Sequence, residues 1–440
     1  MKKFLFFLVT LAFAILITAC ADVDEQPTTI TPFFATDIAV PPASTPEFSC
    51  AIINVIPTPL ADAQSEAPPI TAADYSIGPA DAPVTILEYC DFQSDICLTM
   101  AQTIAELIRN YPGGIRLVFR PFPLTDYFDK SDDAWLAAFA ADKQGKFWEM
   151  YDLLFVKHAE WSHLSPGEFK AWLAREVPAA GMDANQLAEE MKAAETADRL
   201  KSAKEAAALL PVQAAPLVFI NGSLQQYFLD YQSLSDTVGL ILLGQKQFTE
   251  CPPFTIDAAK QYIATIETAK GDIVIQLFPD KAPLAVNSFV FLARQGWFNG
   301  VTFHRVIPGF AAQAGDPTGT GRGNPGYLFN NESNDLLFNK PGVVGMANSG
   351  PDTNGSQFFI TFAPAAHLNG SFTIFGQVIS GLDVAEQLTP RDPAQGGYLP
   401  PGDAILNVTI ISGVATNAGC TRYRHFSERA TTQENLRGAD

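Results

Sequence analysis

Residues 303–310 read Phe-His-Arg-Val-Ile-Pro-Gly-Phe, and Gln313 and the pair Gly315–Asp316 follow within a few residues. On both sides of this stretch, from about 255 to 415, short runs of β-branched and aromatic residues alternate with glycine-rich turns. Such runs predict β-strands, and Pro283 is expected to open a helix among them. Many short strands with few helices predict a closed antiparallel β-barrel. The expected strands lie at 262–266, 272–277, 302–307, 342–346, 357–361 and 372–376.

Two further strings complete this pattern: Asn-Gly-Ser-Gln-Phe-Phe-Ile at 354–360 and Phe-Gly-Gln-Val at 375–378. Together with 303–310, in this order and at this spacing, they resemble the cyclophilin-type peptidyl-prolyl cis-trans isomerases. The resemblance extends over nearly the whole of residues 255–415. It implies a cyclophilin-like closed barrel with flanking helices and the isomerisation of X–Pro peptide bonds.

Isomerisation is slow because rotation breaks the amide resonance, at a cost of ~18–20 kcal/mol. A catalyst of this step needs no metal and no cofactor, only a pocket for the proline ring and a donor for the twisted amide. The resemblance implies the catalytic residues Arg305, Phe310 and Gln313, with Arg305 as the donor to the prolyl nitrogen. The implied substrate contacts are Ala347, Asn348, Gln357, Phe359 and Leu368. Four further contact positions depart from the usual family residues: Ala311 in place of Met, Ser349 in place of Ala, His367 in place of Trp and Phe372 in place of His.

Two other features of this region have structural interpretations. The run Gly319–Gly323 lacks the preceding strand and following helix of a dinucleotide-binding loop, so it is interpreted as a surface loop near the isomerase site. His304 is interpreted as a structural residue rather than a general base.

Residues 71–250 predict a second folded module. Its pattern is a buried strand at 84–89, a helix at 97–110, a strand at 115–119, a long helical region and a closing strand at 217–220. The helical region is expected to contain one long stretch through Trp135 and Phe155 and one helix over 184–210. This layout resembles the thioredoxin-like oxidoreductases of the DsbA family, as do the strings at 78–86 and 144–148. The resemblance implies a cis peptide bond at Ala215–Pro216.

The redox motif of that family is altered. Where the family carries Cys-x-x-Cys, this chain reads Ser94-Asp95-Ile96-Cys97. A hydroxyl cannot replace the attacking thiolate, so an ordinary dithiol oxidoreductase is excluded. Two interpretations stay open: a degenerate module that serves as scaffold or binds peptide, and a non-standard redox pair of Cys90 with Cys97. A bridge between Cys50 and Cys251, which flank the module, is a further hypothesis.

The first twenty residues resemble a targeting signal. Two lysines and a run of apolar or small residues precede Cys20, which resembles a bacterial lipoprotein signal with cleavage after residue 19 and lipidation of Cys20. The alternatives are an ordinary cleaved signal and a short membrane anchor. Residues 20–70 are rich in Pro and Thr and predict an extended tether, whose Cys50 and neighbouring isoleucines are expected to dock on a later domain. Residues 416–440 form a polar tail.

The composition excludes some functions. The chain of 440 residues has 28 Lys and Arg against 47 Asp and Glu, a net charge of −19, which argues against nucleic acid as a partner. Only one of its five histidines lies near a cysteine, so structural zinc is not expected. The sequence therefore predicts a lipid-anchored isomerase on the extracytoplasmic face of the cell membrane, with unfolded or extended X–Pro polypeptides as clients. The main alternative is a chaperone or scaffold in which both modules only bind peptide.

Overall fold

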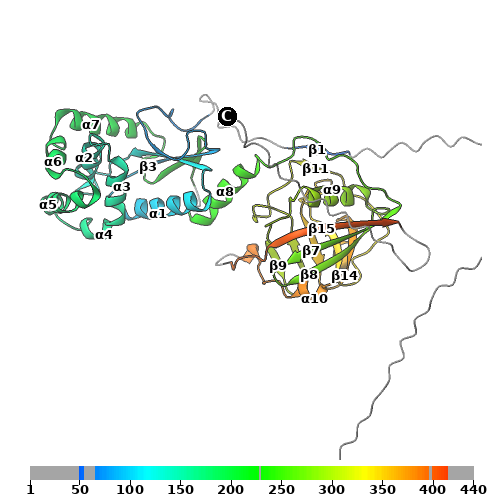
Figure 1. The fold of residues 1–440 in the computed structure, drawn as a ribbon. Helices are drawn as coiled ribbons and strands as arrows, with labels where there is room; N and C mark the ends of the chain where they lie inside the picture. The colour runs from blue at the N-terminus through cyan, green and yellow to red at the C-terminus, as the bar shows by residue number, and fades with distance from the viewer. Residues whose placement is uncertain (1–48, 54–64, 227–228, 396–398, 415–440) are drawn as a thin grey trace, which may run out of the picture. The chain divides into compact units, whose positions relative to one another are not determined.

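The computed structural model describes residues 49–53, 65–226, 229–395 and 399–414 (Figure 1). The predicted signal, Cys20, most of the tether, Cys420 and the polar tail lie outside these residues. Within the described ranges, no helix combines the length and the apolar character needed to cross a membrane.

The first module is built on a five-stranded sheet in the order β2-β4-β3-β5-β6. Strands β3 and β4 are parallel, and the other pairs are antiparallel. The strands span Tyr75–Ile77 (β2), Val84–Cys90 (β3), Ile115–Pro121 (β4), Leu217–Ile220 (β5) and Ser223–Gln225 (β6). The parallel pair is connected through a helix, as a parallel crossover requires. The predicted thioredoxin-like order of strands is therefore present.

Two helices, the first and the last of this module, pack on the sheet, and the helices between them form the insert between β4 and β5 (Figure 1). They span Asp95–Asn110 (α1), Ser131–Asp142 (α2), Phe147–Val156 (α3), His158–Trp161 (α4), Pro166–Glu176 (α5), Ala184–Glu190 (α6), Ala194–Ala208 (α7) and Tyr231–Leu243 (α8), with a 3₁₀ turn at Val177–Ala180. An aromatic core fills the insert, and Trp135, Trp161 and Phe169 in it are completely buried.

Two predicted long helices are each broken in two. The stretch through Trp135 and Phe155 is interrupted between α2 and α3, where Gly145 adopts a left-handed φ of 68°. The helix expected over 184–210 breaks between α6 and α7. Leu187 and Leu200 are thirteen residues apart, so in one straight helix their side chains would point about 140° apart. The break lets both side chains enter the same core.

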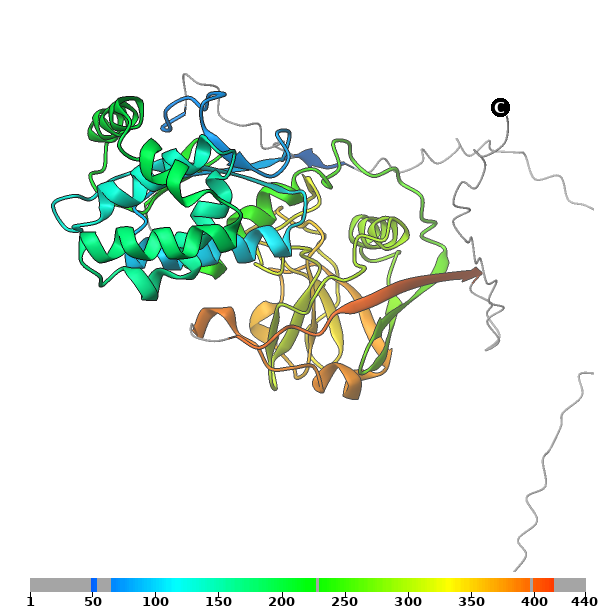
Figure 2. The same cartoon turned by 60° about the vertical axis from the view of Figure 1, so that its left-hand side comes forward.

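The second module is a curled antiparallel sheet (Figure 2). Its eight strands lie in the order β15-β7-β8-β14-β12-β13-β10-β9. The strands span Lys260–Thr268 (β7), Gly271–Leu277 (β8), Arg305–Ile307 (β9), Ala311–Ala314 (β10), Val343–Met346 (β12), Phe358–Thr361 (β13), Ile374–Ser380 (β14) and Ile405–Val414 (β15). Helix α9, Pro283–Arg294, covers the core, and α10 spans Leu382–Glu386. The two end strands meet through a short irregular contact, in which Thr302 bridges Ala404 and the Phe303 amide donates to the Asp403 carbonyl. The predicted barrel closes there without a regular ladder.

The segment before the first module docks on the second. Strand β1, Ala51–Ile52, pairs with β11, Tyr327–Leu328, and Cys50 forms a disulfide with Cys251 at a Cα–Cα distance of 5.9 Å. Docking of the tether was predicted through Cys50 and the neighbouring isoleucines, and the hypothesised bridge of Cys50 with Cys251 is present, whereas Ile52 stays 44% exposed. The backbone ladder and the disulfide hold the segment instead.

Candidate active site

Four residues form a row across four neighbouring strands of the second module. In the antiparallel register Gln313 lies opposite both Arg305 and Phe359, and Phe359 lies opposite Gly345. Directly opposed residues of antiparallel strands project from the same face of a sheet. The register therefore brings a cation, an amide and an aromatic ring side by side, although the four residues span 305 to 359 in the sequence.

A pocket of about 160 Å³ lies at this row. Its lining residues are Arg305, Phe310, Ala311, Gln313, Ala347, Asn348, Phe359, Leu368 and Phe372. All nine were named from the sequence. Aromatic and aliphatic side chains form most of the wall, and Arg305, Gln313 and Asn348 supply the polar groups. A small apolar ring can be held here with donors beside it.

Packing behind the pocket fixes the ring of Phe359. It stacks on Phe338 at a centroid distance of 5.5 Å and meets Phe372 edge-on at 5.4 Å. A Cβ atom at Gly345 would approach the Phe359 ring to 2.8 Å and the Phe338 ring to 3.0 Å. Glycine at this strand position therefore leaves the space that both rings occupy.

Arg305 is oriented by a carboxylate that the sequence analysis did not identify. The Arg305 Nε lies 3.5 Å from Oδ1 of Asp392, and the Arg305 side chain is 38% exposed. Burial pushes the pKa of Asp392 upward, but hydrogen bonds from the Ala394 amide and Gln395, together with the nearby Arg305 charge, leave that pKa below its usual value. An isolated bridge between Val306 and Arg391 brings the Asp392 segment to β9. Asp392 is thus ionised at neutral pH.

Gln313 is oriented in turn by Gln357. The Gln313 Nε2 donates to Oε1 of Gln357 at 2.9 Å, and the Gln357 Nε2 donates to the carbonyls of Gly321 and Gly323, each at 2.9 Å. Gln357 and Ser349 were predicted as substrate contacts, but they do not line the proline pocket and instead line an adjoining pocket of about 340 Å³. The predicted surface loop at 319–323 borders this second pocket.

Two histidines, His367 and His304, lie near the proline pocket but do not line it. The ring of His367 stacks on Phe310 with the centroids 5.8 Å apart. His304 is buried, and neither ring nitrogen has a hydrogen-bond partner in the described part of the chain. Burial is the main cause that lowers the pKa of His304, and the charges of Arg391 and Arg305 lower it further. His304 is therefore neutral near pH 7 and does not line the pocket of Arg305.

Comparison with known proteins agrees with this geometry. Residues 263–410 match the family described as cyclophilin type peptidyl-prolyl cis-trans isomerase. The isomerase ppi1 of Schizosaccharomyces pombe is 49% identical over 127 residues, which are 28% of this chain and 82% of that protein. The chain belongs to this isomerase family. A Helicobacter pylori peptidyl-prolyl cis-trans isomerase is 46% identical over 139 residues, 31% of this chain and 85% of that protein.

The cyclophilin domain is only part of some relatives and of this chain. Peptidyl-prolyl cis-trans isomerase-like 2 of Cryptococcus neoformans is 43% identical over 155 residues, 34% of this chain, and the chain spans 27% of the length of that relative. Residues 71–239 match a different family, described as thioredoxin. The chain therefore joins a thioredoxin-like module to a cyclophilin-type peptidyl-prolyl cis-trans isomerase domain.

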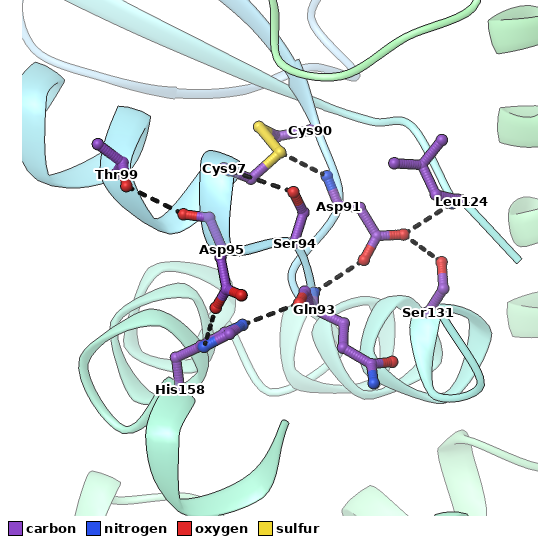
Figure 3. The surroundings of a disulfide bond; sticks show 10 residues. All are labelled: Cys90, Asp91, Gln93, Ser94, Asp95, Cys97, Thr99, Leu124, Ser131 and His158. Atoms are coloured by element: carbon purple, nitrogen blue, oxygen red, sulfur yellow. Dashed lines mark hydrogen bonds and ion pairs between the residues drawn. A yellow bond between two sulfur atoms is a disulfide. The ribbon is translucent and has the colours of Figure 1, made fainter. Parts of the chain in front are cut away.

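The altered redox motif of the thioredoxin-like module lies at the start of α1 (Figure 3). Ser94 is the N-cap, and its Oγ accepts a hydrogen bond from the Cys97 amide at 3.3 Å. Cys97 forms a disulfide with Cys90 at a Cα–Cα distance of 5.8 Å, and both residues are completely buried. The peptide bond Ala215–Pro216 is cis, as the family resemblance implied.

Two buried carboxyl groups near this disulfide were not identified from the sequence. Asp91 accepts hydrogen bonds from Ser131 and from the Gln93 and Leu124 amides, yet burial still raises its pKa (Figure 3). Glu88 is fully buried on β3, and neither of its carboxyl oxygens has a hydrogen-bond partner among the described residues. The signal for Glu88 was its place inside an otherwise apolar strand.

Proposed function

We propose that the chain catalyses cis–trans isomerisation of X–Pro bonds in extended polypeptides, with Arg305 as the group that stabilises the twisted amide. The observation that carries this proposal is the single pocket in which Arg305 and Gln313 stand beside the ring of Phe359. Family membership supports the reaction type, and the geometry supports the assignment of roles.

The reaction needs differential binding of the twisted state rather than proton transfer. When the amide twists, the prolyl nitrogen becomes pyramidal and regains a lone pair that can accept a hydrogen bond from the Arg305 guanidinium. Asp392 holds the guanidinium in place from the other side. The proline ring packs against Phe359 and Leu368, and Gln313 binds the substrate backbone. A donor aimed at developing electron density is the general form of this stabilisation.

A coupled prolyl-isomerase assay on the purified chain tests the proposal. Arg305→Ala should lower kcat/KM by at least ~10²-fold, which corresponds to about 2.7 kcal/mol of transition-state stabilisation. Arg305→Lys should restore little, because the planar fork of donors is lost. Asp392→Asn should cost less than tenfold, because the guanidinium remains while its orientation is loosened. Arg294→Ala, at the exposed end of α9, is the matched control. Near-normal activity of a folded Arg305→Ala protein would refute the mechanism.

The setting of this activity is also a proposal. The lipoprotein-like sequence ending at Cys20 supports attachment to the cell membrane on its extracytoplasmic face, with the Pro-rich residues 20–70 as a tether. Two disulfides among the described cysteines support an oxidising compartment.

The thioredoxin-like module is proposed to act as a scaffold or to bind peptide. At the start of α1 the N-cap position carries a serine and the exposed next position carries Asp95, and both cysteines near that point are buried in the Cys90–Cys97 bridge. Thiol–disulfide exchange requires access of a thiolate to a sulfur atom. Complete burial of both cysteines therefore weighs against the redox alternative.

A further inference from the structure

The proline pocket and the adjoining pocket share one wall. Gln313, Ala347 and Asn348 line both the smaller cavity of about 160 Å³ and the larger one of about 340 Å³. In an extended peptide, side chains two residues apart project to the same side at a spacing of ~6.5–7 Å. A peptide whose proline fills the smaller pocket can therefore place a second side chain in the larger one.

Part of the larger pocket comes from outside the cyclophilin domain. Ile53 lines it together with Leu328, although the family match covers only residues 263–410. The backbone explains this position, because Ala51 pairs with Leu328 and the Ile53 amide donates to the Gly326 carbonyl at 2.9 Å. The tether thus adds an aliphatic side chain to a cavity whose walls, apart from Leu328 and Ala347, are glycines, amides, hydroxyls and Arg322.

The segment that carries Ile53 is held by the Cys50–Cys251 disulfide, by the pairing of β1 with β11 and by the hydrogen bond of the Ile53 amide. Cys50 is bonded to Cys251, so the residues before and after the thioredoxin-like module are cross-linked at the cyclophilin domain. The loop at Pro325 and Gly326, which accepts the hydrogen bond of the Ile53 amide, is itself fixed, because the Phe248 amide donates to the Pro325 carbonyl at 2.8 Å. A Cβ atom at Gly326, whose φ is 92°, would lie 2.4 Å from the Phe248 carbonyl oxygen. Ile53 therefore stands on a fixed backbone rather than on a loose tether.

We propose that Ile53 is a specificity-determining residue of the isomerase, which favours substrates that place an aliphatic side chain in the larger pocket. The inference rests on the proposed isomerase function. Ile53 is 36% exposed without substrate, and an aliphatic side chain packed between Ile53 and Leu328 would remove apolar surface of both partners from water. A glycine at the same substrate position gains nothing from this wall. The competing hypothesis is a preference for an acidic side chain at this substrate position, which the positive charge of Arg322 would attract.

The experiment measures kcat/KM of the full chain on proline peptides in which each position from three before to two after the proline is Leu, Gly or Glu in turn. At the substrate position whose side chain enters the larger pocket, the wild-type protein should prefer Leu to Gly. Ile53→Ala should lower that Leu-to-Gly ratio about three- to tenfold and leave the glycine peptide unchanged. Ile52→Ala is the matched control, because Ile52 precedes Ile53 directly, at the end of β1, and does not line the pocket.

The outcomes separate the two proposals. A wild-type protein that isomerises no peptide would refute the proposed function, and this inference would fall with it. An active protein whose Leu-to-Gly ratio is the same in Ile53→Ala and Ile52→Ala would refute the inference alone. An equal loss on all peptides in Ile53→Ala, or a wild-type preference for Glu at that position, would also overturn it.

Discussion

The buried carboxyl of Glu88 should make the thioredoxin-like module less stable as the pH rises. Burial raises the pKa of Glu88 from its ordinary 4.5 to about 8. Between these two pH values, the folded chain holds a proton on Glu88 that the unfolded chain has released. The free energy of unfolding therefore falls as pH rises through this window and levels off above it. At ~1.4 kcal/mol per pKa unit, the whole effect is about 5 kcal/mol.

Thermal unfolding of the full chain between pH 4.5 and 8.5 measures this effect. Tryptophan fluorescence reports mainly on the thioredoxin-like module, since four of the five tryptophans of the chain lie between residues 135 and 172. For a module of this size, ~2–4 °C in Tm accompanies each kcal/mol, so the Glu88 contribution amounts to about 10–20 °C across the window.

Glu88→Gln isolates the contribution, because it keeps the shape and removes the charge. The variant should match the wild type near pH 4.5 and exceed its Tm increasingly toward pH 8. Asp91, whose pKa is also raised by burial, adds a slope of the same sign to both proteins and cancels in the difference. Glu106→Gln, on the exposed face of α1, is the control. Parallel curves of wild type and Glu88→Gln would refute the reasoning.

Three further variants test the remaining assignments. Cys20→Ser should abolish acyl labelling and release the protein from the membrane fraction; labelling that persists would contradict the lipoprotein interpretation. Ser94→Cys combined with Cys90→Ser should gain thiol–disulfide exchange in an insulin-reduction assay, because a thiol then stands at the positive end of a helix while the wild type stays inactive. Replacing both Cys50 and Cys251 by serine should lower the free energy of unfolding of the cyclophilin domain by about 2–4 kcal/mol in non-reducing urea titrations, and an unchanged midpoint would show that the bridge is dispensable.

The proline pocket could be predicted from the sequence because several of its residues fall within the short strings at 303–316 and 354–360, which carry the family resemblance. Arg305, Phe310 and Gln313 sit on one hairpin, and their mutual positions follow from the strand register. Asp392 could not be identified from the sequence, because it lies outside every string that resembles the family. It comes 87 residues after Arg305, and one isolated bridge, with no periodic pattern of its own, brings it to β9.

Elements that depend on tertiary contacts escaped prediction. Strand β1 has two residues, too few for a hydrophobic alternation, and it forms because a disulfide and the edge of β11 are available. The helix boundary between α6 and α7 depends on which face must enter the core, which local propensity does not encode. Glu88 was included in a strand interpreted as apolar, and the signal that could have identified it was a single carboxyl inside a strand that is buried along almost its whole length.

The cyclophilin domain has the polar groups of its family's site in an open pocket, whereas the thioredoxin-like module lacks the Cys-x-x-Cys pair of its family. In the cyclophilin domain, Arg305 remains half-exposed at the mouth of a pocket, with Asp392 and Gln357 supporting the polar groups from behind. In the thioredoxin-like module, Cys97 is bonded to a cysteine on the preceding strand rather than to one on its own helix. That bridge ties β3 to α1, and both of its cysteines are completely buried. The burial of both sulfur atoms supports the proposed scaffold or binding role of this module beside the cyclophilin domain.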